Sequence, residues 1–169
     1  MEQIFKNKVA LVTGGSFGIG RATPIAFARR GAKVVIADWL EDKETLAAIQ
    51  SGGGEAIFVK CDVSKDVDVK NLVDKTVSQF GRLDFAFNNA GIEGVSAPTH
   101  QCSEENWDKT IGVNLKGVWL CLKYEITTML QTGGGAIVNN ASRAGRLYKY
   151  PRLCCIQTRR NRSHEKRSP

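Results

Sequence analysis

Short apolar runs alternate along this chain with longer stretches in which apolar residues recur at helical spacing. The runs are three or four residues long and mostly unbroken by polar side chains, as in strands that are buried on both faces of a sheet. They lie at residues 9–12, 34–37, 56–59, 85–87 and 136–138. This pattern predicts five strands, separated by four helices in strict alternation.

Three of the intervening stretches carry apolar residues three or four positions apart, which is the spacing of one helix face. They are residues 19–26, 69–80 and 107–122, the last preceded by Ser103 as a candidate N-cap. Glycine clusters at 52–54 and 133–135 mark where helices are expected to end. Strands that alternate with helices of this length predict an α/β fold, a doubly wound parallel sheet with helices on both faces.

A glycine-rich motif, TGGSFGIG at residues 13–20, directly follows the first strand and opens the first helix. A side chain at Gly14, Gly18 or Gly20 would block the approach of the backbone to a pyrophosphate, or the packing of the helix on the strand. The exposed N–H groups and the helix dipole would hold the phosphates. A tight turn that needs flexible residues is the alternative. The residues assigned to the cofactor are Gly14, Ser16, Phe17, Gly18, Ile19 and Gly20.

Asp38 ends the second strand, 20 residues beyond Gly18. A carboxylate at that place can accept hydrogen bonds from the ribose hydroxyls of adenosine. Trp39 follows it, and no arginine stands there to bind a 2′-phosphate, so NAD is favoured over NADP; Lys33 is a weak counter-indication. An aspartate in a solvated loop is the alternative.

With these features in place, the chain resembles the short-chain dehydrogenase/reductase family over residues 4–145. The markers stand in family order as TGGSFGIG, Asp38, Asp62-Val63, Asn88-Asn89-Ala90-Gly91, Asn114 and Ser142. The resemblance implies a Rossmann-type sheet and an NAD(P)-dependent oxidoreductase that transfers a hydride between nicotinamide and an alcohol or carbonyl substrate. It also implies that intact relatives are homo-oligomers with small-molecule alcohol or ketone substrates.

The resemblance also implies roles for individual residues. Asp62 and Val63 would flank the adenine, and the turn 89–91 (Asn89, Ala90 and Gly91) would line the cofactor. Asn114 would belong to a proton relay, and Ser142 would orient and polarise the substrate carbonyl. Each residue also has a structural alternative: Asp62 could be a helix cap and residues 88–89 a turn, and taken alone Asn114 is a polar helix residue and Ser142 a loop residue.

The chain departs from the family at its proton donor, the tyrosine of a YxxxK motif that follows the serine. Tyr148 is followed four residues later by Arg152 and Tyr150 by Cys154, and Pro151 would break a helix carrying either pair. We therefore expect the chain as written to be inactive. The alternative to an enzyme is a catalytically inactive, NAD-binding fragment.

The composition, 42% hydrophobic and 24% charged, is that of a soluble globular domain. No apolar run approaches the ~20 residues that cross a bilayer, so we expect a cytoplasmic protein with no membrane partner. The five cysteines are odd in number and scattered without CxxC pairs, so no metal site is expected.

The net charge of +7 is concentrated at one end, with −1 over residues 1–142 and +8 over residues 143–169. Residues 153–168, re-read one base out of frame with allowed codons, give YAASKHGVIGHTKSA, which contains YxxxK. We therefore interpret residues 1–145 as an incomplete NAD-binding domain, truncated after its fifth strand, and residues 146–169 as a disordered or out-of-frame tail. Binding of nucleic acid or an acidic surface by residues 159–167 is a remote alternative; no nucleic-acid partner is expected.

Overall fold

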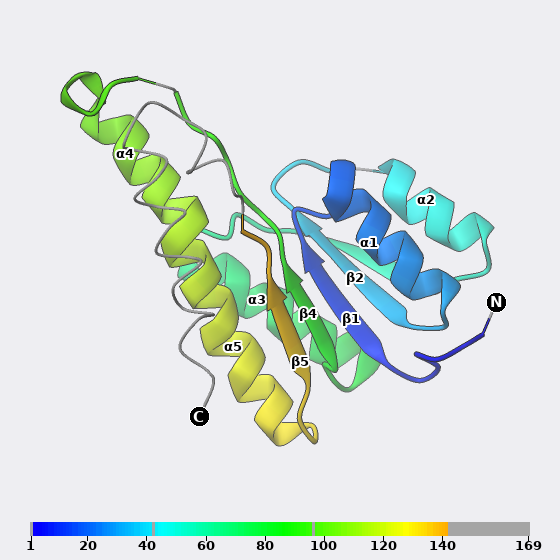
Figure 1. Ribbon diagram of the computed structural model, residues 1–169. Coiled ribbons are helices and arrows are strands. Elements are labelled where there is room, and N and C mark those ends of the chain that lie inside the picture. The colour runs from blue at the N-terminus through cyan, green and yellow to red at the C-terminus, as the bar shows by residue number, and fades with distance from the viewer. Residues whose placement is uncertain (1, 42, 96, 142–169) are drawn as a thin grey trace, which may run out of the picture.

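The computed structural model describes residues 2–41, 43–95 and 97–141, which form a parallel sheet between two layers of helices (Figure 1). All neighbouring strands run parallel, in the order β3-β2-β1-β4-β5. The strands are β1 (Val9–Thr13), β2 (Lys33–Asp38), β3 (Ala56–Lys60), β4 (Phe85–Asn88) and β5 (Ala136–Asn139). The five predicted strands and the doubly wound α/β class are thereby confirmed.

Helices α1 and α2 cover one face of the sheet, and α3 and α5 cover the other (Figure 1). The helices are α1 (Gly18–Arg29), α2 (Lys43–Ser51), α3 (Asp66–Phe80), α4 (Glu104–Ile111) and α5 (Val118–Gln131), with a short 3₁₀ turn at Thr99–Gln101. α2 and α5 end just before the two glycine clusters, as expected. Pro24 lies inside α1, which continues past it to Arg29.

Each helical layer encloses its own apolar core. Leu11 and Val35 of the central strands pack toward α3 and α5, together with Leu72 and Leu120 from those helices. The opposite side chains of the same strands pack toward α1 and α2, where the ring of Phe5 also contacts those of Phe27 and Phe85 (centroids 5.2 and 5.1 Å apart). Because both faces are covered, the central strands contain almost no polar residue.

The long helical stretch expected at 107–122 is instead two helices separated by the π-helical segment η2 (Gly112–Gly117). The predicted cap is confirmed, because the Ser103 Oγ accepts a hydrogen bond from the Asn106 N–H (3.3 Å). Single π turns within helices are frequent at functional sites. Asn114 lies in the middle of this one.

Asp84 joins the amino-terminal ends of β1 and β4. Its buried carboxylate accepts hydrogen bonds from the Val9 N–H (3.0 Å), the Lys8 Nζ (3.0 Å) and the Arg82 guanidinium (2.6 and 2.8 Å). Burial alone raises the pKa of Asp84, but these hydrogen bonds bring it below its ordinary value. This end of the sheet is therefore closed by an ion-pair cluster, and the carboxyl ends of the strands remain to carry a site.

β5 is the last strand on its side of the described sheet, and Val138 on its α1-facing side is 57% exposed. The predicted domain boundary at 145, the tail 146–169 and Ser142 lie outside the described residues. Within the described ranges, no helix has the length and apolar character to cross a membrane.

Candidate nucleotide site

The carboxyl ends of β1 and β4 are joined by Thr13 and Asn89. The Thr13 Oγ1 accepts hydrogen bonds from the N–H groups of Asn89 (3.1 Å) and Ala90 (3.2 Å). The Asn89 Nδ2 in turn donates to the Gly14 carbonyl (3.1 Å). The fold therefore brings Gly14 of the glycine motif together with Asn89 and Ala90, which lie about 75 positions away in the sequence.

The glycines of the motif differ in the space that is available to a side chain. A Cβ on Gly20 would overlap the Gly14 carbonyl oxygen and lie 2.7 Å from the Asn89 Nδ2. Gly14 has φ +64°, and its Cβ would lie 2.9 Å from the Ala90 Cα. Gly18 has φ +52°, yet a Cβ there would meet no atom within 4 Å. The first two positions need a close approach of backbones, whereas Gly18 faces open space.

The amino-terminal end of α1 is uncapped. Phe17 is the N-cap residue, its side chain makes no capping hydrogen bond, and the first turn contains no acidic residue. Phe17 and Ile19 are exposed, whereas Ser16 is fully buried and its Oγ has no hydrogen-bond partner among the described residues. This leaves the N–H groups and the positive end of the helix dipole available to an anion.

Asp38 joins the end of β2 to the glycine motif and is only 8% exposed. Its Oδ2 accepts a hydrogen bond from the Ser16 N–H (3.1 Å), and its Oδ1 accepts one from the Leu40 N–H (3.3 Å). The alternative of a solvated loop aspartate is therefore wrong. Trp39, directly after it, is 65% exposed.

Arg21 of the first helix also bonds to Ser16. The Arg21 Nε donates to the Ser16 carbonyl (2.7 Å), and its guanidinium pairs with Glu44 of α2 (2.7 Å). Arg21 thus ties the glycine motif to α2. The arginine is already engaged by protein groups.

Asp62 and Val63 follow β3 in a turn. The Asp62 Oδ1 accepts hydrogen bonds from the N–H (3.0 Å) and the Oγ (2.7 Å) of Ser64. Burial raises its pKa, but these bonds and the Lys65 charge bring the pKa below its ordinary value. The N-cap of α3 is Lys65, so Asp62 is not the helix cap. Val63 is 7% exposed and lies against Gly117, where a Cβ would be 2.8 Å from its Cγ2.

Asn114 holds the segment that follows the turn 89–91. Its Oδ1 accepts a hydrogen bond from the Ile92 N–H (2.9 Å), and its Nδ2 donates to the Ile92 carbonyl (2.7 Å). Asn114 is 8% exposed. This two-way bond places the π segment η2 beside the candidate nucleotide site, whereas Ser142 lies outside the described residues.

Sequence reasoning missed several residues that shape this edge of the sheet. Thr13 was assigned no role, and neither were residues 139–140 or Glu125. Asn139 pairs in register with Asn88, and the Asn140 Nδ2 donates to the Asn89 Oδ1 (2.9 Å). A signal was present, because two of the predicted apolar runs, 85–87 and 136–138, are both followed by Asn-Asn.

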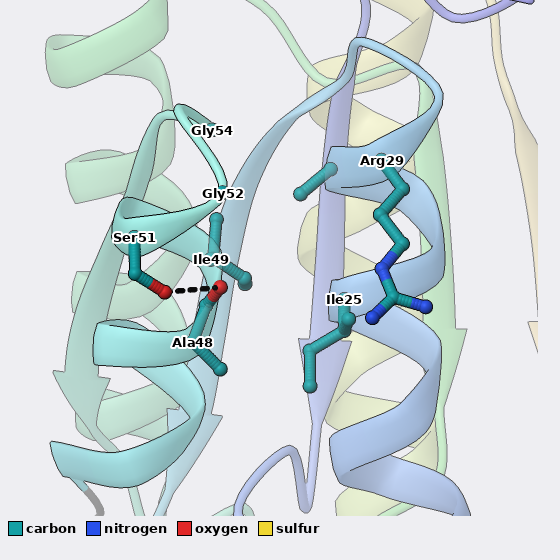
Figure 2. Close-up of a pocket in the computed structure, with 8 residues that line it drawn as sticks. Ile25, Arg29, Ala48, Ile49, Ser51, Gly52 and Gly54 are labelled. Carbon is teal, nitrogen blue, oxygen red and sulfur yellow. Dashed lines mark hydrogen bonds between the residues drawn. The ribbon is translucent and has the colours of Figure 1, made fainter. Parts of the chain in front are cut away.

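A hollow of ≈ 250 Å³ lies elsewhere, between the carboxyl-terminal ends of α1 and α2 (Figure 2). It is lined by Ile25, Ala28, Arg29, Ala48, Ile49, Ser51, Gly52 and Gly54. Because α1 begins at Gly18 and the hollow lies near its other end, the hollow is separate from the glycine motif.

The described cysteines and acidic residues form no second site with a reactive thiol or a metal-binding cluster. Cys61 and Cys121 are buried, and Cys102 is partly buried. Burial, with smaller contributions from nearby aspartates, raises the pKa of Cys61 to about 12, which keeps its thiol protonated. Across the described ranges, no three His, Cys, Asp or Glu side chains could hold a metal ion together.

The site can now be compared with known proteins. A family model described as short chain dehydrogenase matches residues 8–155. The chain belongs to the short-chain dehydrogenase family. An uncharacterized oxidoreductase of Thermotoga maritima is 49% identical to it over 152 residues, which cover 89% of this chain and 59% of the relative.

Two further short-chain dehydrogenase relatives have more specific names. A cyclohexanol dehydrogenase of an Acinetobacter species is 44% identical over 147 residues, covering 86% of this chain and 59% of that protein. The structure of an NAD⁺-bound xylitol dehydrogenase superposes with a TM-score of 0.81 at 34% identity, covering 92% of this chain and 60% of that one. This chain therefore spans less than two thirds of the length of these relatives.

Proposed function

We propose that this chain binds the adenosine diphosphate part of a nicotinamide cofactor, with NAD preferred over NADP. The observation that carries the proposal is the shape of the glycine motif. Gly14 and Gly20 let the backbones of β1, α1 and the 89–91 turn approach one another, while Gly18 leaves open space in front of the uncapped helix. Residues of this kind would hold a pyrophosphate through backbone N–H groups.

The buried polar groups around the motif fit the same ligand. The Ser16 Oγ is buried without a partner among the described residues, which is unfavourable unless something else bonds to it. A phosphate oxygen or a water bound with it would satisfy this hydroxyl. The exposed Phe17, Ile19 and Trp39 side chains surround the proposed site with apolar surface that a nucleotide would partly cover.

The preference for NAD rests on charge at the end of β2. The Asp38 carboxylate can accept hydrogen bonds from ribose hydroxyls, and its negative charge would repel a 2′-phosphate. Arg21 bonds to the Ser16 carbonyl, but its guanidinium is paired with Glu44. The NAD⁺-bound xylitol dehydrogenase agrees with this choice without deciding it for this chain.

The reaction we propose for the intact protein is that of its family. A bound nicotinamide would accept or donate a hydride, and the substrate would be a small alcohol or ketone, as the name of the cyclohexanol dehydrogenase suggests. Asn114 would belong to a proton relay, and Ser142 would polarise the carbonyl. Asp62, Val63 and the 89–91 turn would contact the cofactor.

Nucleotide titration tests the binding proposal. We expect the chain to bind NAD weakly and ADP-ribose nearly as well, because the groups assigned to adenosine and phosphates all precede residue 92. Asp38→Ala should weaken both by about 1.5–3 kcal/mol, the usual contribution of a hydrogen bond to a charged group. Isothermal titration calorimetry with both ligands measures this. Folded protein that binds neither, or an unchanged affinity in Asp38→Ala, would contradict the proposal.

We expect no hydride transfer by the 169-residue chain, because it contains no YxxxK motif. General acid/base groups contribute ~10² to 10⁴ in rate, so residual turnover should be small even with NAD bound. The measurement is NADH absorbance with panels of alcohols and ketones. Turnover that Tyr148→Phe or Tyr150→Phe abolishes would show that one of these tyrosines is the proton donor. Binding without turnover would instead favour the inactive NAD-binding fragment.

The remaining expectations concern the whole protein. Its division into an NAD-binding domain (1–145) and a separate tail, its assembly into homo-oligomers and its cytoplasmic location stay predictions. Binding of nucleic acid through the basic tail is not favoured by any described residue.

A further inference from the structure

Glu125 is a fully buried acid on α5, at the carboxyl ends of β4 and β5. It is 0% exposed, and its Oε2 accepts a hydrogen bond from the Asn88 Nδ2 (2.9 Å). Its Oε1 has no hydrogen-bond partner among the described residues. An isolated carboxylate in such a place is strongly disfavoured, whereas a neutral carboxyl group is tolerated.

Among the described residues, the elements around Glu125 supply no compensating positive charge. α5 packs against α3, η2 and β4. Asp66 of α3 pairs with Lys123 at the surface, and Asp68 accepts a hydrogen bond from the Asp62 N–H. Lys70, Asp74 and Lys75 of α3 and Lys116 of η2 are exposed, and β4 has no charged residue. Burial raises the pKa of Glu125 to about 7, and the hydrogen bond from Asn88 lowers it only in part. The side chain therefore gains or loses its proton near neutral pH.

Two sets of side-chain hydrogen bonds, joined by the backbone of consecutive asparagines, connect this acid to the glycine motif. The Asn88 Nδ2 that donates to Glu125 also donates to the Asn139 Oδ1 on the neighbouring strand (3.0 Å). The next residues of both strands are joined as well, by the bond from the Asn140 Nδ2 to the Asn89 Oδ1. Asn89 then donates to the carbonyl of Gly14. Two adjacent asparagine pairs thus separate Glu125 from the proposed phosphate loop.

We propose that Glu125 is a positioning residue for the nucleotide site. Its protonated carboxyl group lets α5 pack against the Asn88–Asn139 pair, and its deprotonation weakens the hydrogen bond from the Asn89 side chain to the Gly14 carbonyl. A carboxylate formed at this position requires water, which enters only if α5 and the ends of β4 and β5 separate. That separation displaces Asn89 and Asn140, which follow directly. Only the expected change in nucleotide affinity rests on the proposed function.

Amide hydrogen exchange tests the proposal without any ligand. The N–H groups of Asn89 and Ala90 report on the contact between the 89–91 turn and the end of β1, because both donate to the Thr13 Oγ1. If the locally opened state lets Glu125 ionise with its ordinary pKa of 4.5, their protection factors should fall roughly thirty-fold between pH 5.5 and 8.5. Glu125→Gln keeps the hydrogen-bond acceptor without the charge, and should show less than a two-fold change.

Asp84→Asn is the matched control, since it removes a buried carboxylate at the opposite end of β4. Its protection factors should fall with pH as in the wild-type chain. A flat wild-type profile, or an equal fall in Glu125→Gln, would overturn the proposal. Should Glu125→Gln fail to fold, carbon-13 titration of the Glu125 carboxyl in the wild-type chain decides, because its midpoint must coincide with the fall in protection.

Titration with ADP-ribose at several pH values measures how the protonation of Glu125 affects ligand binding. The wild-type affinity should fall over the same pH range, and that of Glu125→Gln should stay constant within two-fold. An absence of binding at pH 5.5 would refute the proposed function, while the amide measurement would still decide the role of Glu125. Binding with the same pH dependence in both chains would refute the role of Glu125 alone.

Discussion

Gly20→Ala is expected to abolish detectable ADP-ribose binding and to lower the free energy of unfolding by about 1–3 kcal/mol, the range for overpacking a rigid interior. The added methyl group would overlap the Gly14 carbonyl and lie 2.7 Å from the Asn89 Nδ2. Neither atom can withdraw freely, because the two are hydrogen-bonded to each other. The glycine motif must therefore shift away from the 89–91 turn. Urea unfolding and calorimetric titration measure the two effects.

Gly52→Ala is the control for this substitution. A Cβ on Gly52 would meet its nearest neighbour, the Ile49 carbonyl, at an ordinary 3.4 Å, and the position lies in the loop after α2. We expect its stability to stay within about 0.5 kcal/mol of the wild-type chain and its ADP-ribose affinity to be unchanged. Equal behaviour of the two variants would mean that the close approach of Gly20 and Gly14 is not what the fold requires.

The free energy of unfolding of the wild-type chain is expected to fall relative to Glu125→Gln as the pH rises from 4.5 to 7. The pKa of Glu125 is raised from 4.5 to about 7 in the folded state, so the folded chain binds more protons than the unfolded chain in this window. Stability therefore decreases with rising pH, by about 3 kcal/mol in total, and the difference is constant above the folded-state pKa. Urea unfolding at half-unit pH intervals measures the difference between the two chains.

Asp84→Asn provides a comparison of opposite sign. The folded-state pKa of Asp84 is lowered, so the stability it contributes is present above its unfolded pKa and is lost as the pH falls through the folded value. Relative to Asp84→Asn, the wild-type chain should lose its advantage in acid, and relative to Glu125→Gln it should lose stability toward neutral pH. Parallel curves for the wild-type chain and Glu125→Gln would show that Glu125 does not titrate inside the fold.

The strands could be predicted from the sequence because both faces of the sheet are covered. Residues 9–12 and 34–37 are unbroken apolar runs. In the structure, β1 adds only Thr13 to the first run, and β2 adds Lys33 and Asp38 to the second. The alternation of strands and helices also predicts where Gly14, Gly20 and Asp38 lie, because parallel strands bring their carboxyl ends to one edge of the sheet. The predicted strands therefore also located this edge.

The π segment and the asparagine pairs could not be predicted in the same way. The interruption at residues 112–117 coincides with the bonds between Asn114 and Ile92, which lie 22 positions apart and outside any helical period. Glu125 stands between polar and apolar positions of a helix, where a glutamate normally faces water. Only the packing of α5 on the ends of β4 and β5 reveals that it is buried.

β1 lies in the middle of the sheet, but its two neighbours leave the ribosome at different times. β2 and β3 follow it directly, so these three strands can associate with α1 and α2 once the first 60 residues are made. β4 and α5 complete the other side only about 70 residues later, and at ~5–20 residues per second this takes several seconds. Until α3 and then α5 are in place, Leu11 and Val35 face solvent on the unfinished side, where a chaperone can bind the nascent chain.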